Sequence, residues 1–209
     1  RRLALLAWDR RETFLTGRRL PIADALAEAL AGPAPFVIAD AGDATNGGAR
    51  GDSTELLRAA LSHTDRRIML TVTDPAAAAA LRAADVGTTV TVALGGGPPD
   101  AYDAATRVTG TVLAHPEGRF RYQHPFSRGV PGDLGTCAVL GIGELRVVVH
   151  SLPVGVIDPG PYLGAGLDPA DAEVIQAKSH ISYRTGFDPL TPRSVVAATP
   201  GPTTAEGEP

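Results

Sequence analysis

The sequence of 209 residues is poor in cysteine and in lysine, with one of each, Cys137 and Lys178. A single cysteine excludes an intrachain disulfide and a zinc site built from several cysteines. Cys137 lies in an apolar segment, and we expect its thiol to be buried and unreactive. The low cysteine content fits a reducing, cytoplasmic setting without demanding it.

Long apolar runs and basic clusters are also lacking. No apolar run approaches the roughly 20 residues of a membrane span, and charged residues at positions 9–12 interrupt the apolar start before a signal peptide could form. The net charge is −4 and no basic stretch is long, which argues against nucleic acid as a partner. We therefore expect neither a membrane nor a nucleic acid as the partner of this chain.

Familiar local motifs of enzymes are absent. The sequence contains no GxxxxGK[ST], GxGxxG, GxSxG or HExxH. Its five histidines stand apart from one another, so no local zinc motif exists, and we predict no metal ligand within the chain. Ser53 precedes a predicted helix without an identified base, which disfavours a serine hydrolase.

The most informative stretch is residues 36–61, where an apolar run, a glycine-rich polar loop and a helical pattern follow one another. The run 36–39 predicts a buried strand, and the spacing of the apolar residues after the loop predicts a helix. Asp52 stands where a phosphate-binding loop has lysine, so the loop suits a cation, a hydroxyl or an amine. The candidate ligand-binding residues of this stretch are Asp40, Asp43, Asn46, Gly47, Gly48, Asp52 and Ser53. The alternative is that Asp52 and Ser53 only cap a helix while the glycines only turn the chain.

Lys178 ends a second predicted strand, 173–178, and is followed by His180 and Tyr183. Ligands of open α/β sheets gather at the carboxyl ends of the strands. If this strand lies beside the strand 36–39, Lys178 faces the aspartates of the glycine-rich loop. It would then act as a charge partner, a proton donor or an oxyanion clamp. The alternative is a structural ion pair or a solvated lysine.

The patterns together predict an α/β fold: a βαβ core with a mixed sheet flanked by helices, and a strand-rich antiparallel insertion. Residues 1–32 predict two helices, 1–15 and 21–31, and residues 36–94 predict a βαβαβ core of parallel strands. Residues 106–151 predict antiparallel strands, with a hairpin turn at Gly143 and Glu144. The last strands, in 173–198, return to the core sheet, and residues 199–209 form a tail.

Residues 40–61, DAGDATNGGARGDSTELLRAAL, resemble the signature of the C-terminal domain of MlrC-like proteins, a microcystin-degrading type of zinc metallopeptidase. In that family an Asp- and Gly-rich loop ends in Gly-Asp-Ser/Thr ahead of a helix. The likeness covers nearly the whole chain. It includes GDLG at 132–135, VVVHSLPVGVIDPGPYLGAGLDPADAEVIQAKS at 147–179, YRTGFDPLT at 183–191 and SVVAATPGPTT at 194–204.

The resemblance implies that residues 1–209 are the C-terminal domain of a metallohydrolase, a peptidase or amidohydrolase, and are inactive alone. Zinc would be held by an Asp-x-His motif and a further histidine of an upstream N-terminal domain, which is absent from this chain. The implied partners are that N-terminal domain and a small peptide or amide substrate. The chain does not begin with methionine, so we expect it to be cut from a longer protein.

On this basis we predict Asp43 and Lys178 as catalytic residues. The predicted substrate-binding residues are Asp40, Asn46, Gly47, Gly48, Asp52, Ser53, His180 and Tyr183. The alternative function is a non-catalytic small-ligand-binding or assembly domain, whose glycine-rich loop holds a small anionic metabolite. Assembly into a homo-oligomer stays open under either function.

Overall fold

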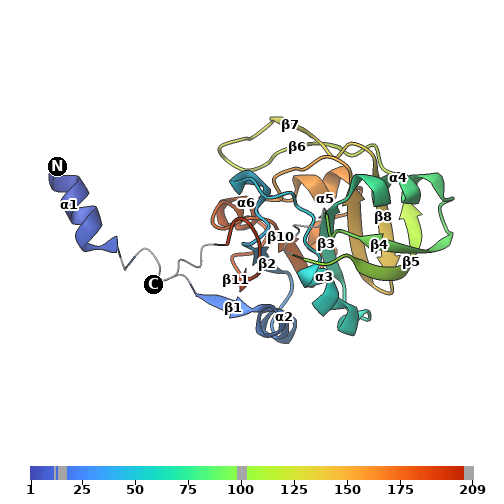
Figure 1. The fold of residues 1–209 in the computed structure, drawn as a ribbon, viewed down its shortest axis with the longest axis horizontal. Helices are drawn as coiled ribbons and strands as arrows, with labels where there is room; N and C mark the ends of the chain where they lie inside the picture. The colour runs from blue at the N-terminus through green and yellow to red at the C-terminus, as the bar shows by residue number, and fades with distance from the viewer. Residues whose placement is uncertain (12, 14–17, 98–102, 205–209) are drawn as a thin grey trace.

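A mixed nine-stranded sheet with helices on both faces organises the chain, and a two-stranded sheet lies beside it (Figure 1). The computed structural model describes residues 1–11, 13, 18–97 and 103–204. In sheet order the nine strands are β1 (Arg19–Pro21), β11 (Ser194–Ala198), β2 (Phe36–Asp40), β10 (Val174–Ala177), β3 (Ile68–Thr73), β9 (Leu145–His150), β8 (Cys137–Ile142), β5 (Thr106–Ala114) and β4 (Thr89–Leu94). This architecture confirms the predicted α/β class with a mixed sheet.

The first six strands in that order run parallel, so their carboxyl ends meet at one edge of the sheet. Every residue of β2, β3 and β10 is buried, as expected for parallel strands covered on both faces. Strand β10 lies between β2 and β3. These two strands are consecutive core strands in the sequence but are not neighbours in the sheet. The carboxyl edge therefore collects loops from distant parts of the chain.

The prediction of β4 as a third parallel core strand was wrong. It lies at the edge of the sheet and pairs antiparallel with β5 alone. Alternate residues of β4 are exposed, and the hydroxyls of Thr91 and Thr109 pair across the two strands at 2.9 Å. The alternation of Thr and Val that predicts this strand is typical of a half-exposed antiparallel strand, not of a parallel core strand.

The strands of residues 106–151 pair antiparallel, as predicted, but most of them extend the main sheet. Strand β8 pairs with β5 and β9, and β9 then pairs parallel with β3. The β8–β9 hairpin turns at Gly143, whose φ of +58° favours glycine, which confirms the predicted turn. The separate two-stranded sheet consists of β6 (Arg119–Arg121) and β7 (Pro131–Asp133).

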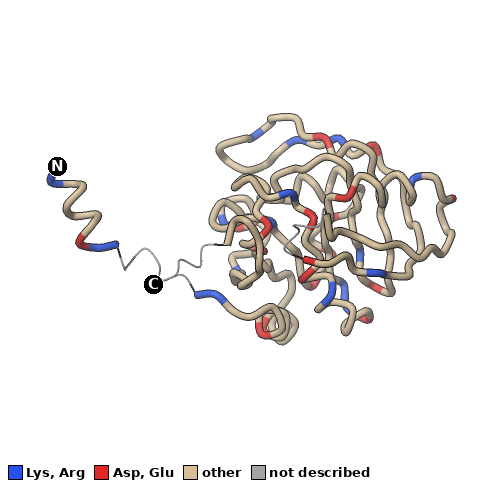
Figure 2. The backbone as a smooth tube through the Cα atoms, viewed as in Figure 1, with Lys and Arg blue, Asp and Glu red and all other residues tan. Residues whose placement is uncertain are grey.

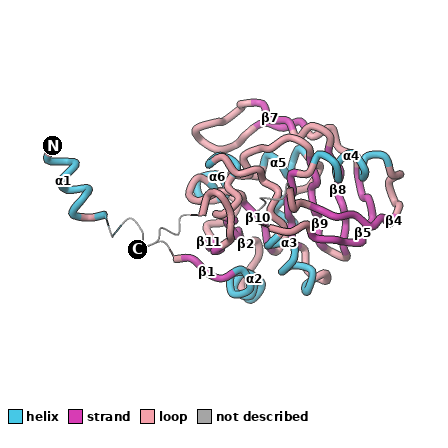
Figure 3. Tube along the Cα trace, viewed as in Figure 1, coloured by secondary structure: helices cyan, strands magenta, loops and turns pink. Residues whose placement is uncertain are grey.

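Helices cover both faces of the sheet, so the core has two apolar layers (Figure 3). One face is covered by α2 (Ile22–Ala31), α3 (Glu55–Ala60) and α4 (Pro75–Ala83). The other face carries α5 (Gly160–Gly164) and α6 (Tyr183–Phe187). Short 3₁₀ turns occupy Thr45–Gly47, Leu61–His63 and Pro169–Asp171. Cys137 is buried as predicted, and burial raises the pKa of its thiol.

At the N-terminus, α1 (Arg2–Asp9) is shorter than the predicted helix 1–15, and residues 12 and 14–15 of that prediction lie outside the described residues. No residue of α1 is buried, and the helix projects away from the sheet (Figure 1). Acidic and basic positions are interspersed over the chain (Figure 2). None of the helices within the described ranges has the length and apolar character needed to cross a membrane.

Candidate functional site at the carboxyl edge of the sheet

The glycine-rich loop and Lys178 meet at the carboxyl edge of the parallel strands. Strand β10 pairs with β2 in register from Val174 opposite Phe36 to Ala177 opposite Ala39. Asp40 ends β2 and Lys178 follows β10 directly, so the two side chains begin one residue beyond the paired segment. The predicted approach of Lys178 to the aspartates of the loop is confirmed.

Lys178 forms a buried ion pair with Asp43. Its Nζ lies 2.6 Å from Asp43 Oδ2 and 3.7 Å from Asp40 Oδ2. The ammonium also donates to the Ser53 carbonyl oxygen at 3.4 Å. The lysine and aspartate side chains are at most 3% exposed. A charged group so far from water needs partners of opposite charge, and this lysine has two.

The electrostatics keep Lys178 protonated. Burial alone would lower its pKa, but the attraction of Asp43 and Asp40 outweighs burial, and the pKa of Lys178 is raised above 10.5. The pKa of Asp40 is raised, because the effect of burial is larger than the opposing effect of the Lys178 charge. At neutral pH the ammonium therefore supplies fixed positive charge, and it does not act as a base.

Asp43 also shapes the loop that follows it. Its Oδ1 accepts a hydrogen bond from the backbone N–H of Gly51, and its Oδ2 accepts one from the N–H of Ser53, both at 2.8 Å. Gly51 has a φ of +79°, and a Cβ there would lie 2.6 Å from Thr73 Oγ1. A glycine is therefore required where the loop passes β3. The Asp43–Lys178 pair thus holds the loop against two strands.

The C-terminal tail closes the other side of the loop. Thr199 Oγ1 donates to Asp40 Oδ1 at 2.6 Å and accepts from the N–H of Gly42 at 2.8 Å. Thr203 Oγ1 donates to the Ala41 carbonyl and accepts from the N–H of Ala44. The described part of the predicted tail is therefore bound to the site, and residues 205–209 lie outside the described residues.

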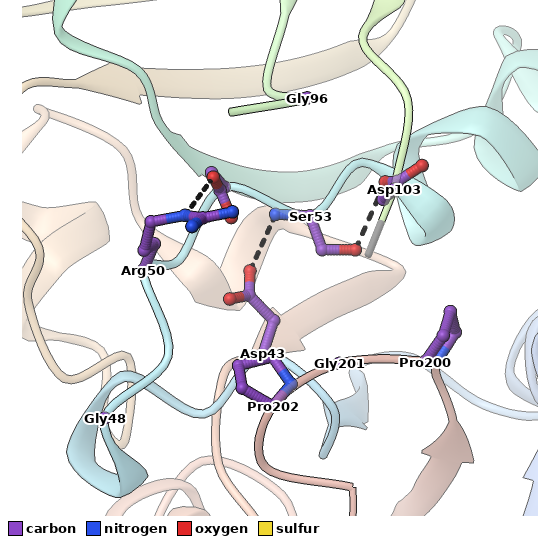
Figure 4. Close-up of a pocket in the computed structure, with 10 residues that line it drawn as sticks. Asp43, Gly48, Arg50, Ser53, Gly96, Asp103, Pro200, Gly201 and Pro202 are labelled. Atoms are coloured by element: carbon purple, nitrogen blue, oxygen red, sulfur yellow. Dashed lines mark hydrogen bonds and ion pairs between the residues drawn. The ribbon is translucent and has the colours of Figure 1, made fainter. Parts of the chain in front are cut away.

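The loop and the tail enclose a cavity of about 330 Å³, which we call the first cavity (Figure 4). It is lined by Asp43, Gly48, Arg50, Asp52, Ser53, Gly96, Asp103, Pro200, Gly201 and Pro202. Its three carboxylates are each paired with a cation. Asp43 is paired with Lys178, Arg50 Nε lies 2.7 Å from Asp52 Oδ2, and Arg58 Nη2 lies 2.6 Å from Asp103 Oδ1. The charges of the lining are thus balanced in place.

This chain is similar to known proteins in both sequence and fold. Residues 38–208 match the family described as the MlrC C-terminus. The chain belongs to this family. A solved structure named as a "putative metallopeptidase" from Mesorhizobium sp. BNC1 is similar to it, with a TM-score of 0.88 and 29% sequence identity. That similarity covers 98% of this chain but 41% of the solved chain, so the relative has much further sequence. No match is found among curated proteins.

The structure of this MlrC C-terminal domain does not support the alternative in which Asp52 and Ser53 only cap a helix. Helix α3 begins at Glu55 with Thr54 as its N-cap residue, and the Thr54 side chain makes no capping bond. Instead Asp103 Oδ2 accepts a hydrogen bond from the N–H of Thr54 at 2.7 Å. The distant Asp103 thus replaces a local cap.

The hydroxyl of Ser53 has weak partners in the domain. It lies 3.4 Å from Asp103 Oδ2 and accepts from the N–H of Glu55 at 3.4 Å. No histidine is a hydrogen-bond partner of this hydroxyl among the described residues. Ser53 therefore lines the first cavity without a histidine base beside it.

The other predicted residues of the MlrC C-terminal domain fall in different places. Asn46 and Gly47 are exposed in the 3₁₀ turn at the rim of the loop. His180 Nε2 contacts the carbonyl oxygen of Thr203, so it binds the tail. Tyr183 is 1% exposed and packs into the apolar layer beneath α6, away from the first cavity. The structure therefore does not bring Tyr183 to the lining.

The parts of the chain that the structure describes lack a cluster of metal-binding side chains. No group of three or more His, Cys, Asp or Glu side chains in these parts could hold a metal ion. The aspartates of the first cavity are instead bound to backbone N–H groups, lysine and arginine. These residues do not fit a zinc site by themselves.

Two charged residues of the lining were missed in the sequence-based prediction, Arg50 and Asp103. Arg50 lies inside the signature loop as Ala49-Arg50-Gly51, so its position was a usable signal. Asp103 comes from the connection between β4 and β5, and no local pattern there predicts contact with Thr54. The tail residues were noted only as part of the family resemblance.

Replacing Asp103 tests its role in fixing the site. We expect Asp103→Ala to lower the free energy of unfolding by about 1–2 kcal/mol, because the Thr54 N–H and Arg58 lose their partner. Burial acts to raise the pKa of Asp103, but Arg58 and Thr54 outweigh it and the pKa is lowered below 3.8. The stabilisation is thus present above pH 3.8 and is lost as the pH falls through the lowered value. Urea unfolding at pH 7 measures it, with the exposed Asp85→Ala as control, and equal losses in both variants would refute this role.

Proposed function

We propose that this MlrC C-terminal domain supplies the substrate-positioning cavity of a zinc-dependent peptidase or amidohydrolase. The zinc ligands would lie outside this chain, in the N-terminal domain of the same protein. The substrate would be a small peptide or amide. The observation that carries the proposal is the first cavity itself, a charged hollow formed by the family's signature loop at the carboxyl edge of the parallel strands.

The residues of the first cavity have distinct tasks in this proposal. Arg50 donates hydrogen bonds to a carbonyl or carboxylate of the substrate, because a guanidinium binds such groups through two N–H donors. Asp52 accepts from the guanidinium at 2.7 Å and orients it. Ser53 offers its hydroxyl to the substrate amide. All three lie on one loop, so a shift of the loop would move them together.

Lys178 and Asp43 act as positioning residues in this account. The Nζ of Lys178 is buried beneath the loop, and Asp43 already accepts three hydrogen bonds. Their fixed charges still contribute to the electrostatic potential in the cavity, since both side chains are buried and screening by water is weak. We therefore assign these two residues, predicted to be catalytic, the role of holding the loop that contacts the substrate.

The test is an arginine substitution in the full-length protein. We expect Arg50→Ala to lower kcat/KM for small peptide amides by about 10- to 100-fold, the loss typical of a hydrogen bond to a charged group. Arg107→Ala is the matched control, because Arg107 is exposed on β5 and does not line the cavity. Equal kcat/KM values for Arg50→Ala and the unmodified protein would refute the assignment.

The alternative function is a non-catalytic domain that binds a small anionic ligand. Its support is that the first cavity is lined by Arg50, whose guanidinium can bind an anionic group. It predicts ligand binding without hydrolysis in the full-length protein, and the same loss of affinity in Arg50→Ala. Calorimetry with a small carboxylate such as N-acetylglycine, beside the hydrolysis assay, separates the two functions.

A further inference from the structure

A second cavity of about 360 Å³ adjoins the first one at the same edge of the sheet. It is lined by Arg50, Asp52, Thr73, Asp74, Pro75, Gly95, Gly97, Ser151 and Pro153. Arg50 and Asp52 line both cavities, so their ion pair forms a shared wall. A ligand that lies along this wall could reach both spaces at once.

The second cavity follows the sheet from β2 and β10 toward β3 and β9. Thr73 is the last residue of β3, and Ser151 directly follows β9. Pro75 is the first residue of α4, and Gly95 directly follows β4. The carboxyl edge therefore presents two neighbouring compartments, each above a different pair of parallel strands.

The polar groups of the second cavity are largely engaged within the protein. The Asp74 carboxylate accepts from the N–H groups of Ala77 and Gly95 at 2.9 and 3.0 Å. Ser151 Oγ accepts from the N–H of Thr136 at 2.9 Å. The exception is the hydroxyl oxygen of Thr73, which is buried and has no hydrogen-bond partner among the described residues. What remains facing the space is mostly apolar surface, a larger share than in the first cavity.

We propose that the second cavity binds an apolar side chain of the same peptide or amide substrate whose polar main-chain groups lie in the first cavity. The inference rests on the proposed function and adds its substrate class: amides with an apolar side chain of about leucine or phenylalanine size beside the bond that is cleaved. Arg50 lines both compartments, and its guanidinium, held by Asp52, forms part of the wall between them. Transfer of the side chain from water into this space supplies the selectivity.

The experiment compares amides of glycine, alanine, leucine and phenylalanine as substrates of the full-length protein. We expect kcat/KM for the leucine and phenylalanine amides to exceed that for the glycine amide by about 10- to 100-fold. Pro75→Phe should reduce this preference at least about tenfold, because the added ring occupies the cavity that the larger side chains would enter. Pro75→Ala is the matched control, because it removes the same proline from the first position of α4 without filling the space.

The outcomes separate this inference from the proposed function. Hydrolysis without preference for apolar side chains, or an equal loss for all four amides in Pro75→Phe, would overturn the inference and leave the proposed function standing. If no amide is hydrolysed, calorimetry with N-acetyl-leucinamide and N-acetyl-glycinamide gives the same comparison as affinities. Tighter binding of the leucine compound, abolished in Pro75→Phe, would then support the second cavity, and equal binding would overturn it.

Discussion

Replacing Lys178 with methionine is expected to lower the free energy of unfolding by about 3–5 kcal/mol, the loss typical when one partner of a buried ion pair is removed. Methionine fills most of the volume of the lysine stem, so the loss reports charge more than packing. Without the ammonium, Asp43 and Asp40 stay buried as two uncompensated carboxylates at the end of β2. Urea unfolding of the two proteins at pH 7 measures the difference.

Two controls make this result specific. Asp43→Asn combined with Lys178→Met should lower the free energy of unfolding by less than the sum of the two single losses, because each single variant leaves the other side chain without its nearest partner of opposite charge. The folded pKa of Lys178 is raised above 10.5, so its stabilisation is present below pH 10.5 and is lost as the pH rises through the folded value. The alkaline loss should be absent from Lys178→Met. A loss under about 1 kcal/mol at pH 7 would show that the pair does not hold the loop.

The second large effect on stability concerns His150, whose protonation should lower the free energy of unfolding. Its Nδ1 lies 2.9 Å from the Leu152 carbonyl oxygen, which can only accept, so Nδ1 carries the proton and Nε2 has none. Nε2 is buried and has no hydrogen-bond partner among the described residues. Burial lowers the pKa of His150 from 6.5 to about 4, a change that corresponds to about 3 kcal/mol.

The sign of this effect follows from proton binding. Between pH 6.5 and about 4 the unfolded chain binds a proton at His150 that the folded protein does not bind, so stability falls as the pH falls. In His150→Asn the amide can still donate to Leu152 and does not titrate, so this part of the pH dependence should disappear. Unfolding curves between pH 7 and 4 test it, with His63→Asn as the control that keeps it. Identical pH profiles of His150→Asn and the unmodified protein would contradict this account.

The fold was predictable as far as short-range patterns determine it. The buried strands 36–40 and 68–73 and the hairpin at Gly143 follow from apolar runs and turn residues near in sequence. The order of strands was not predictable, because β10 enters the sheet from more than 100 residues away from both neighbours. The three-residue strand β1 has no periodicity long enough to be recognised.

The candidate site was predictable only where its residues follow elements that short-range patterns indicate. Asp43 and Lys178 each follow a recognisable strand, so their meeting required only that the two strands be neighbours. Asp103 and the tail residues reach the site through tertiary contacts with no sequence spacing to indicate them. Arg50 and Asp52 are two residues apart in one loop and form an ion pair. The sequence does not indicate that this pair lines two cavities, which only the structure shows.

The most direct test of the central claim is the metal content and amide-hydrolase activity of the full-length protein beside those of residues 1–209 alone. The account predicts that the full-length protein binds at least about one zinc ion per chain and hydrolyses amides. It predicts that the isolated domain does neither. Stoichiometric zinc in residues 1–209, or full-length protein with neither zinc nor hydrolysis, would contradict a site divided between this domain and the rest of the protein.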